Sequence, residues 1–280
     1  MTTIRETWIR GAERLVAAGI DSARLDARVL VAHAMNLTPG ESVSSREPSA
    51  EELARYEDLL ARRIAREPVA YIVGEREFWS LPFAVGPGVL IPRPETETLL
   101  EQAQHFLPDR SESLEVLDLG TGSGAILIAF LKDYPQARGV GIDRSSKALG
   151  WARRNGEVLG VAGRVEWVEG DWKAATGRTY DLIFANPPYL TLGERSGLAP
   201  EVGGHEPPEA LFAGPEGLES YRALAPVLAA VLAPQGLAIL EVGAGQAEAV
   251  NAILRAYGLE IRAVAPDLAG IPRALVAGRT

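Results

Sequence analysis

The sequence predicts an α/β protein in which a small helical bundle precedes a mainly parallel sheet. Apolar residues recur at helical spacing through the first third of the chain, and strand and helix patterns alternate after residue 110. The last two strand patterns lie too close together for a helical crossover, so they are expected to form an antiparallel pair at the sheet edge. A length of 280 residues suggests one large domain or two.

The first part of the chain, residues 1–70, has the pattern of a helical bundle. Ser49 and Glu52 match a capping box at the start of an apolar helical stretch. Glu67-Pro68 is expected to end that helix, because proline disfavours helical geometry in the residue before it. We expect this bundle to support folding or to recognise a partner, because nothing in it is typical of a catalytic site.

Residues 71–93 mix β-branched and aromatic residues with glycine and proline, which predicts a hairpin-like linker between domains. Residues 94–280 then form the second predicted domain. It opens with a helix over Thr96–Leu107 and contains a long loop rich in Gly, Pro and Glu over Gly193–Gly217. The strands expected in it are 114–119, 139–142, 165–168, 180–185, 237–242, 259–264 and 273–277.

Composition restricts the possible functions. The 28 basic and 37 acidic residues give a formal net charge of −9, which makes the chain a poor general binder of phosphate backbones. Without cysteine it has no disulfide, thiolate nucleophile or Cys-ligated zinc. The start of the chain has no secretory signal, and no apolar run approaches the ~20 residues of a membrane span. A cytoplasmic location is therefore expected.

The first chemical signal is the segment DLGTGSG at residues 118–124, which ends a strand and opens a helix. Glycines allow a sharp turn and the close approach of a ligand, and amides at the helix start are expected to be free to donate hydrogen bonds. Ligands of doubly wound sheets bind outside the carboxyl ends of the strands. A cofactor loop is therefore favoured over two alternatives. One is a turn without a ligand, and the other is a nicotinamide fingerprint formed by Gly120, Gly122 and Ala125.

Two further residues follow the next strands. Asp143 ends the second strand about twenty residues after the glycine loop, where a carboxylate can accept hydrogen bonds from both ribose hydroxyls of an adenosine. The alternative is a helix cap, a role that Ser145 could also fill. Asp171-Trp172 ends the third strand region, where an adenine ring would lie, although a tryptophan alone is more often simply packed.

The strongest signal is Asn186-Pro187-Pro188-Tyr189 after the fourth strand. The prolines lack N–H groups and stiffen the chain, so the nearby carbonyls have few local partners. Oxygen atoms of Asn186 and Pro187 held side by side would suit a planar NH₂ group, and Tyr189 could pack over a flat substrate. The alternative, a stiff loop without chemistry, is less favoured opposite a glycine-rich cofactor loop.

These residues resemble S-adenosylmethionine-dependent methyltransferases that modify planar nitrogen. The closer resemblance is to the peptide chain release factor glutamine methyltransferases, the HemK-like group. It spans residues 71–277, and the helical first third is similar in length and character. The NPPY motif alone is shared with adenine and guanine amino-group methyltransferases, whereas IPRPETE together with HEP is much more specific. Small departures are Leu190, where isoleucine is usual, and Phe212-Ala213-Gly214. The segments that carry the resemblance are VLIPRPETE, LDLGTGSGAI, GDW, DLIFANPPY, HEPPEALFAGPEGLESYR and LEVG.

The resemblance implies a Rossmann-like class I methyltransferase domain with a seven-stranded sheet. It implies methyl transfer from S-adenosyl-L-methionine, with S-adenosyl-L-homocysteine as product, to a glutamine amide nitrogen. That glutamine would belong to the Gly-Gly-Gln motif of bacterial class I release factors, which residues 1–70 would help to recognise. No metal, stable nucleic-acid partner or membrane partner is expected. The implied cofactor contacts are Gly120, Thr121, Gly122, Ser123, Gly124, Asp143, Trp172 and Asn186. The implied glutamine contacts are Asn186, Pro187, Pro188 and Tyr189, of which Asn186 and Pro187 would be catalytic.

Three other functions compete with this one. An amino-group methyltransferase acting on an adenine or guanine base would need the same nitrogen geometry, but the net charge of −9 disfavours it. A nicotinamide-dependent oxidoreductase and a binding module without catalysis both leave NPPY unexplained. His33, His105 and His205 are isolated in the sequence, so no dedicated general base is evident.

Overall fold

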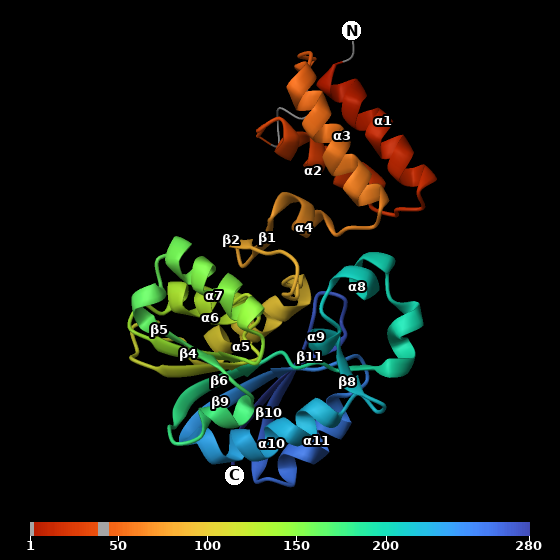
Figure 1. Cartoon of the computed structure of the whole chain (residues 1–280). Coiled ribbons are helices and arrows are strands. Elements are labelled where there is room, and N and C mark those ends of the chain that lie inside the picture. Colours follow the sequence, from red (N-terminus) through yellow and green to blue (C-terminus); the bar gives the residue numbers. More distant parts are fainter. Residues whose placement is uncertain (1–2, 39–44) are drawn as a thin grey trace. The chain divides into compact units, whose positions relative to one another are not determined.

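The computed structural model describes residues 3–38 and 45–280 (Figure 1). The chain divides into two compact units. Unit 1 contains the residues up to Glu75 together with Ala199–His205, and unit 2 contains Arg76–Leu198 and Glu206–Thr280. The sequence-based prediction of residues 1–70 as one bundle includes residues 1–2 and 39–44, which lie outside the described residues.

Unit 1 is helical. Its helices are α1 (Ile4–Ala17), α2 (Ala23–Ala34), α3 (Ala50–Ile64), α4 (Val69–Val73) and α8 (Pro200–His205). The capping box at the start of α3 is confirmed, because Ser49 Oγ accepts a hydrogen bond from the amide of Glu52 at 3.2 Å and the Ser49 amide donates to Glu52 Oε2 at 2.7 Å. Fully buried apolar side chains such as Ile4, Leu30 and Leu60 form the core of the bundle.

A buried arginine joins three parts of unit 1. Arg63 of α3 donates to Asp26 Oδ2 of α2 and to Glu201 Oε1 of α8, each at 2.8 Å. Its guanidinium also donates to the carbonyl oxygen of Glu67 at 3.3 Å. Because Arg63 is only 3% exposed, these partners replace the water that the charge loses on burial. The segment 199–205 therefore belongs to the helical unit, although the chain reaches it from unit 2.

Unit 2 contains a seven-stranded sheet in the order β10-β11-β9-β6-β3-β4-β5. Strands β5, β4, β3, β6 and β9 are parallel, and β11 pairs antiparallel with both β9 and β10. The predicted α/β class, the mainly parallel sheet and the antiparallel final pair are thus confirmed. The strands are β3 (Glu115–Leu119), β4 (Arg138–Asp143), β5 (Val165–Glu169), β6 (Tyr180–Ala185), β9 (Leu232–Glu241), β10 (Leu259–Pro266) and β11 (Pro272–Arg279).

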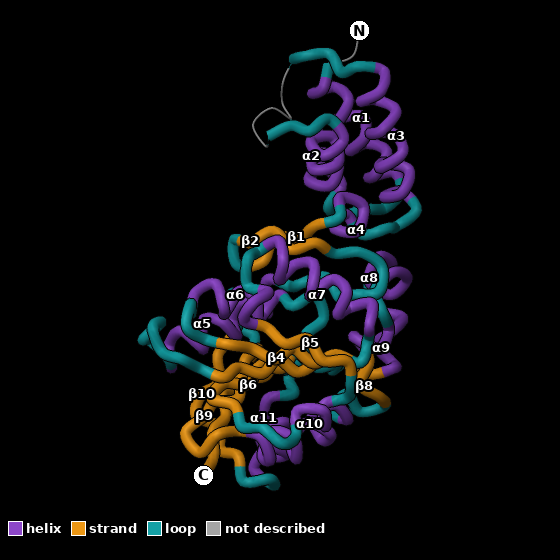
Figure 2. Tube along the Cα trace, turned by 60° about the vertical axis from the view of Figure 1, so that its left-hand side comes forward, coloured by secondary structure: helices purple, strands orange, loops and turns teal. Residues whose placement is uncertain are grey.

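Helices cover both faces of this sheet (Figures 1 and 2). Successive strand residues point to opposite faces, so Leu182 and Phe184 pack in one core and Ile183 and Ala185 in the other. On the first face lie α5 (Glu97–Phe106), α6 (Ala125–Asp133) and α7 (Ser146–Val158), and on the second lie α10 (Glu219–Val231) and α11 (Ala247–Arg255).

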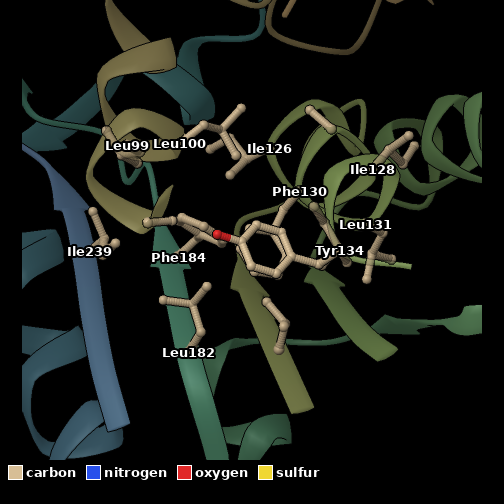
Figure 3. Packing of buried hydrophobic residues seen from close by; sticks show 14 of the residues in the cluster. Leu99, Leu100, Ile126, Ile128, Phe130, Leu131, Tyr134, Leu182, Phe184 and Ile239 are labelled. Carbon is tan, nitrogen blue, oxygen red and sulfur yellow. The ribbon is translucent and has the colours of Figure 1, made fainter. Parts of the chain in front are cut away.

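Aromatic packing fills the first core (Figure 3). Phe130 of α6 and Tyr134, the residue after the helix, stack with ring centroids 4.1 Å apart, and Phe184 of β6 meets Phe130 edge-on at 5.5 Å. The Tyr134 hydroxyl donates to the carbonyl oxygen of Leu107 at 2.5 Å, which satisfies its one polar atom. This packing holds the second half of α6 against the sheet.

Short elements occupy the remaining segments. A two-stranded hairpin of β1 (Glu75–Phe78) and β2 (Leu81–Ala84) lies within the predicted linker. The predicted loop over Gly193–Gly217 is more ordered than expected, because it contains α8, α9 (Pro208–Leu211) and β8 (Phe212–Gly214), which pairs with β7 (Leu190–Thr191). Among the described residues, none of the helices is long and apolar enough to span a bilayer.

Replacement of Arg63 by methionine should destabilise unit 1. The change leaves two carboxylates without their buried cation, which typically costs about 3–5 kcal/mol. Hydrogen–deuterium exchange should therefore become faster in α2, α3 and residues 199–205. The matched control is Arg62→Met, because Arg62 forms a more exposed pair with Glu67, and such pairs contribute about 1 kcal/mol or less. Equal protection in both variants would contradict a stabilising role for the Arg63 cluster.

Candidate active site

The site lies where the order of the strands reverses. From β3 the chain proceeds outward on one side through β4 and β5, and then returns to place β6 on the other side of β3. Leu119 at the end of β3 pairs with Ala185 at the end of β6. The loops that follow these two strands therefore diverge at the carboxyl edge of the sheet, which is where ligands of such sheets bind.

A cavity of about 400 Å³ opens at this edge, within the range of small-molecule sites. It is lined entirely by residues of unit 2. Of the residues predicted from the sequence, those that line it are Gly120, Thr121, Gly122, Ser123, Asp143, Trp172, Asn186 and Pro188. The predicted residues Gly124, Pro187 and Tyr189 are not among its lining residues. Their contacts with a ligand stay predictions.

The glycine loop contributes shape to this cavity. Gly120, Gly122 and Gly124 have φ values of +80°, +56° and +79°, a region that side chains with a Cβ rarely adopt. A Cβ on Gly124 would lie 2.9 Å from side-chain atoms of Ile128 and Trp167, so that glycine serves helix packing.

The loop amides are bonded within the protein, contrary to the expectation that they would be free. Those of Gly120 and Thr121 donate to the carbonyl oxygen of Ile142 at 2.9 and 3.0 Å, and that of Gly124 donates to the carbonyl oxygen of Thr121 at 2.8 Å. The loop is thereby held to the neighbouring strand, and its main contribution is the close approach that it allows to a ligand.

Asn155 of α7 also fixes this loop. Its Nδ2 donates to the carbonyl oxygen of Ser123 at 2.9 Å and to that of Ala84 at 3.0 Å, and its Oδ1 accepts from the Ala84 amide at 2.8 Å. This buried side chain therefore connects α7, the glycine loop and β2.

Asp143 joins the glycine loop to the start of α7. Its Oδ2 accepts from the Gly122 amide at 2.9 Å and its Oδ1 from the Ser145 amide at 2.8 Å. Ser145 is the helix cap, because its Oγ accepts from the Ala148 amide at 3.2 Å. A carboxylate has about four lone-pair sites, so Asp143 can accept further hydrogen bonds from a ligand in the cavity that it lines.

Asp118 lies beneath the loop with no solvent exposure. Thr121 Oγ1 donates to its Oδ2 at 2.6 Å, while its Oδ1 has no hydrogen-bond partner among the described residues. Burial, with a smaller contribution from the nearby Asp143, raises the pKa of Asp118 to about 7, against the hydrogen bond from Thr121. The sequence identified Asp118 only as part of the loop motif.

Asn186 is held by a chain of side-chain hydrogen bonds. Its Nδ2 donates to Thr96 Oγ1 at 3.2 Å, and Thr96 Oγ1 donates to Glu241 Oε2 at 2.5 Å. The hydroxyl of Tyr189 donates to Glu241 Oε1 at 3.2 Å. Because the amide nitrogen of Asn186 faces Thr96, the oxygen Oδ1 lies at the opposite end of the planar amide group.

The rest of the NPPY segment is also anchored within unit 2. Pro187 is buried, Pro188 lines the cavity, and the carbonyl oxygen of Tyr189 accepts from Gln246 Nε2 at 3.0 Å. Burial raises the pKa of the Tyr189 phenol well above its usual range, as does the neighbouring carboxylate of Glu241.

A second buried carboxylate joins two distant motifs. Glu206 Oε2 accepts from the Ile91 amide at 3.0 Å, and Glu206 Oε1 pairs with the guanidinium of Arg93, which lines the cavity. This pair joins IPRPETE to HEP, since each segment supplies half of one ion pair.

Sequence reasoning assigned no role to Thr96, Glu241, Glu206 or Arg93. All four lie inside segments that carry the family resemblance, and that was the only signal that could have found them. Within the described ranges 3–38 and 45–280, no cluster of three or more His, Asp or Glu side chains could hold a metal ion.

Comparison with known proteins identifies relatives of this chain. Residues 6–74 match the family model "PrmC N-terminal domain", and residues 95–199 match "Methyltransferase small domain". A release factor glutamine methyltransferase of Cereibacter sphaeroides is 46% identical over 268 residues, covering 95% of this chain and 94% of that protein. One of Caulobacter vibrioides is 43% identical over 266 residues, covering 94% of this chain and 92% of that protein.

Solved structures show the same fold. A methyltransferase from Pyrococcus furiosus superposes with a TM-score of 0.52 at 17% sequence identity, covering 79% of this chain and 98% of that chain. At this identity the likeness concerns the fold alone. The Rossmann-like class I architecture expected from the sequence is confirmed by the sheet order together with this match.

The buried carboxyl of Asp118 should make stability depend on pH. Its folded-state pKa of about 7 lies above the usual 3.8, so its contribution to stability is complete below about pH 3.8 and is lost as the pH rises to about 7. An Asp118→Asn variant lacks this titration. From about pH 5 to about pH 8, the unfolding free energy of the variant relative to wild type should rise by about 3 kcal/mol. Denaturant unfolding at the two pH values measures it, and a difference that does not change with pH would contradict the shifted pKa.

Proposed function

Because the chain belongs to the release factor glutamine methyltransferase family, we propose that it methylates the side-chain amide nitrogen of a glutamine in a class I peptide chain release factor. The proposed target is the glutamine of the Gly-Gly-Gln motif. The chain is an S-adenosylmethionine-dependent methyltransferase by family and fold. We also infer a cytoplasmic location, because the proposed partner acts in translation.

The orientation of Asn186 is the observation that carries the proposal. Its amide nitrogen is held by Thr96, so the end that remains for a substrate is the acceptor Oδ1. An acceptor at this position suits a substrate that carries an NH₂ group, as a glutamine side chain does. The backbone oxygen of Pro187 is proposed as the second acceptor.

The residues that would hold the cofactor also fit it. The glycine loop lets a nucleoside approach the backbone closely, Asp143 offers carboxylate oxygens for ribose hydroxyls, and Trp172 lines the same cavity. Bound S-adenosylmethionine would supply an electrophilic methyl group on a sulfonium. A volume of about 400 Å³ is adequate for a ligand of this size.

The main task of the protein in this reaction is to orient the amide nitrogen of the substrate toward the methyl group. A carboxamide nitrogen is a poor nucleophile because its lone pair is delocalised into the carbonyl. Holding it in line with the methyl group can contribute ~7–11 kcal/mol in favourable systems. The N–H groups become more acidic as the nitrogen attacks, so hydrogen bonds to Asn186 Oδ1 and the Pro187 oxygen strengthen in the transition state. The proton can leave after methyl transfer, so no dedicated base is required.

Family membership favours glutamine over the nucleic-acid alternative, and the net charge of −9 points the same way. We further propose that unit 1 contributes to recognition of the release factor. The match of residues 6–74 to a domain model of this family supports that role. The catalytic cavity itself involves only unit 2.

Incubation of a purified class I release factor with the protein and methyl-labelled S-adenosylmethionine should place the label on the glutamine of the Gly-Gly-Gln motif. Peptide mass spectrometry locates the label. A release factor with that glutamine changed to alanine is the matched control and should stay unlabelled. Label on added RNA or DNA, with none on the release factor, would instead support the base-modifying alternative.

In the same assay the Asn186→Ala variant should lose methyl transfer, because the substrate amide loses an acceptor. Affinity for S-adenosylhomocysteine, measured by calorimetry, should fall much less than activity, because the glycine loop and Asp143 still line the cavity. Wild-type activity in this variant would refute the acceptor mechanism.

Asp143→Ala should weaken cofactor binding by removing the acceptor for ribose. Hydrogen bonds to a charged group contribute about 1.5–3 kcal/mol, or roughly 10- to 100-fold in affinity. The substitution also releases Gly122, which Asp143 holds, so the ribose contact needs its own control. Wild type should bind S-adenosylhomocysteine more tightly than an analogue lacking the ribose hydroxyls, whereas the variant should bind both about equally. The same preference in both proteins would rule out the ribose assignment.

A further inference from the structure

Two buried polar side chains support the NPPY segment from outside the motif. Thr96, at the end of a short 3₁₀ turn before α5, is 4% exposed, and Glu241, the last residue of β9, is 1% exposed. They are 145 residues apart in the sequence and meet through a hydrogen bond of 2.5 Å. A buried carboxyl group is unfavourable unless it has hydrogen-bond partners, so the burial of Glu241 depends on its partners.

Glu241 is connected to both ends of NPPY by hydrogen bonds. Thr96, which in turn contacts Asn186, donates to Oε2, and Tyr189 donates to Oε1. Burial raises the pKa of Glu241, whereas these two hydroxyls and the positive charge of Arg273 lower it. One carboxyl group thus contacts the first residue of the motif through Thr96 and the last residue directly.

The hydrogen-bond directions determine which way Asn186 points. A threonine hydroxyl has one proton, and in Thr96 this proton is donated to Glu241. The oxygen of Thr96 can then only accept toward Asn186, so it meets the NH₂ end of that amide. If the amide were flipped, two oxygen atoms would face each other with no proton between them. The flipped state is therefore disfavoured, and Oδ1 is directed away from Thr96.

We propose that Thr96 and Glu241 are positioning residues that fix the amide of Asn186 with its oxygen available to the substrate, and that Glu241 also anchors Tyr189. This inference rests on the proposed function, since it assigns a purpose to the orientation of Asn186. Neither residue needs to touch substrate or cofactor to act in this way. The hydroxyl of residue 96 is the essential group, so a serine at this position should preserve the function and a valine should not.

The first test compares Thr96→Val, Thr96→Ser and Thr98→Val in the full-length protein. Thr98 is a matched control, because it is a buried threonine of α5 with 5% exposure that does not line the described cavity. Thr96→Val should lower kcat roughly 10- to 100-fold, as expected for a misplaced reacting group, with little change in affinity for S-adenosylhomocysteine. Thr96→Ser should restore most of the activity, and Thr98→Val should not lower kcat. A Thr96→Val variant with wild-type kcat, or a Thr98→Val variant with the same loss, would overturn the proposal.

A second measurement observes Asn186 without any substrate. The chain has four asparagines, Asn36, Asn155, Asn186 and Asn251, so ¹⁵N-asparagine labelling gives a simple set of side-chain NH₂ signals. The Asn186 pair is identified by its absence from the Asn186→Ala variant. Thr96→Val should shift that pair and speed its hydrogen exchange, whereas Thr96→Ser and Thr98→Val should not. An unchanged Asn186 signal in Thr96→Val would refute the positioning role even if no release factor is methylated, so the two proposals can fail separately.

A double-mutant cycle tests whether the two residues act through one chain of hydrogen bonds. In the Glu241→Gln variant an NH₂ group can face Thr96 in place of a carboxylate oxygen, so this variant should also have a lower kcat. Because both changes disturb the same bond to Asn186, the kcat of the double variant Thr96→Val/Glu241→Gln should be little lower than that of Glu241→Gln alone. If the fold-losses in kcat of the two single variants multiplied in the double variant, as they do for independent sites, the shared chain of hydrogen bonds would be contradicted.

Discussion

The parallel pairing of β3 with β6 is the constraint on which the site depends. Their ends meet at Leu119 and Ala185, so the glycine loop and Asn186 emerge side by side, although 62 to 66 residues separate them in the sequence. Alternating burial on the two faces of β6 keeps this pairing in register, because a shift of one residue would move Leu182 and Phe184 out of one core and into the other. The fold thus brings the glycine loop and Asn186 together at one edge of the sheet.

Three buried carboxyl groups hold the walls of this site. Asp118 lies under the glycine loop, Glu206 joins the Ile91–Arg93 segment to the wall formed by Pro207 and its neighbours, and Glu241 lies behind NPPY. Each has an exposure of 3% or less, where an apolar residue would usually be more favourable. Buried hydrogen bonds with a single allowed direction orient a neighbouring group more strictly than apolar packing does.

The chain enters unit 1 a second time after it has formed part of unit 2. It leaves unit 2 after Leu198, forms α8 as part of unit 1, and returns at Glu206. The buried Arg63 holds Glu201 within the helical unit, while Glu206 shortly afterwards binds Arg93 at the cavity. Residues close together in the sequence are therefore tied to the proposed recognition unit and to the cofactor cavity.

Local sequence by itself predicted the strands of the main sheet and most of the loop residues that line the cavity. Period-2 and period-3.6 apolar patterns depend on neighbours along the chain, and so do the capping box at Ser49 and the stiff turn of Pro187-Pro188, which is why these could be predicted. Most of the predicted residues, from Gly120 to Asn186, line one cavity because the rule for parallel sheets places loops at one edge. The tertiary structure alone decided the partners across the fold: Thr96 with Asn186 and Glu241, Arg93 with Glu206, and Arg63 with Glu201. A single sequence contains no signal for which distant donor meets which acceptor, because that choice is made by packing among residues far apart in the chain.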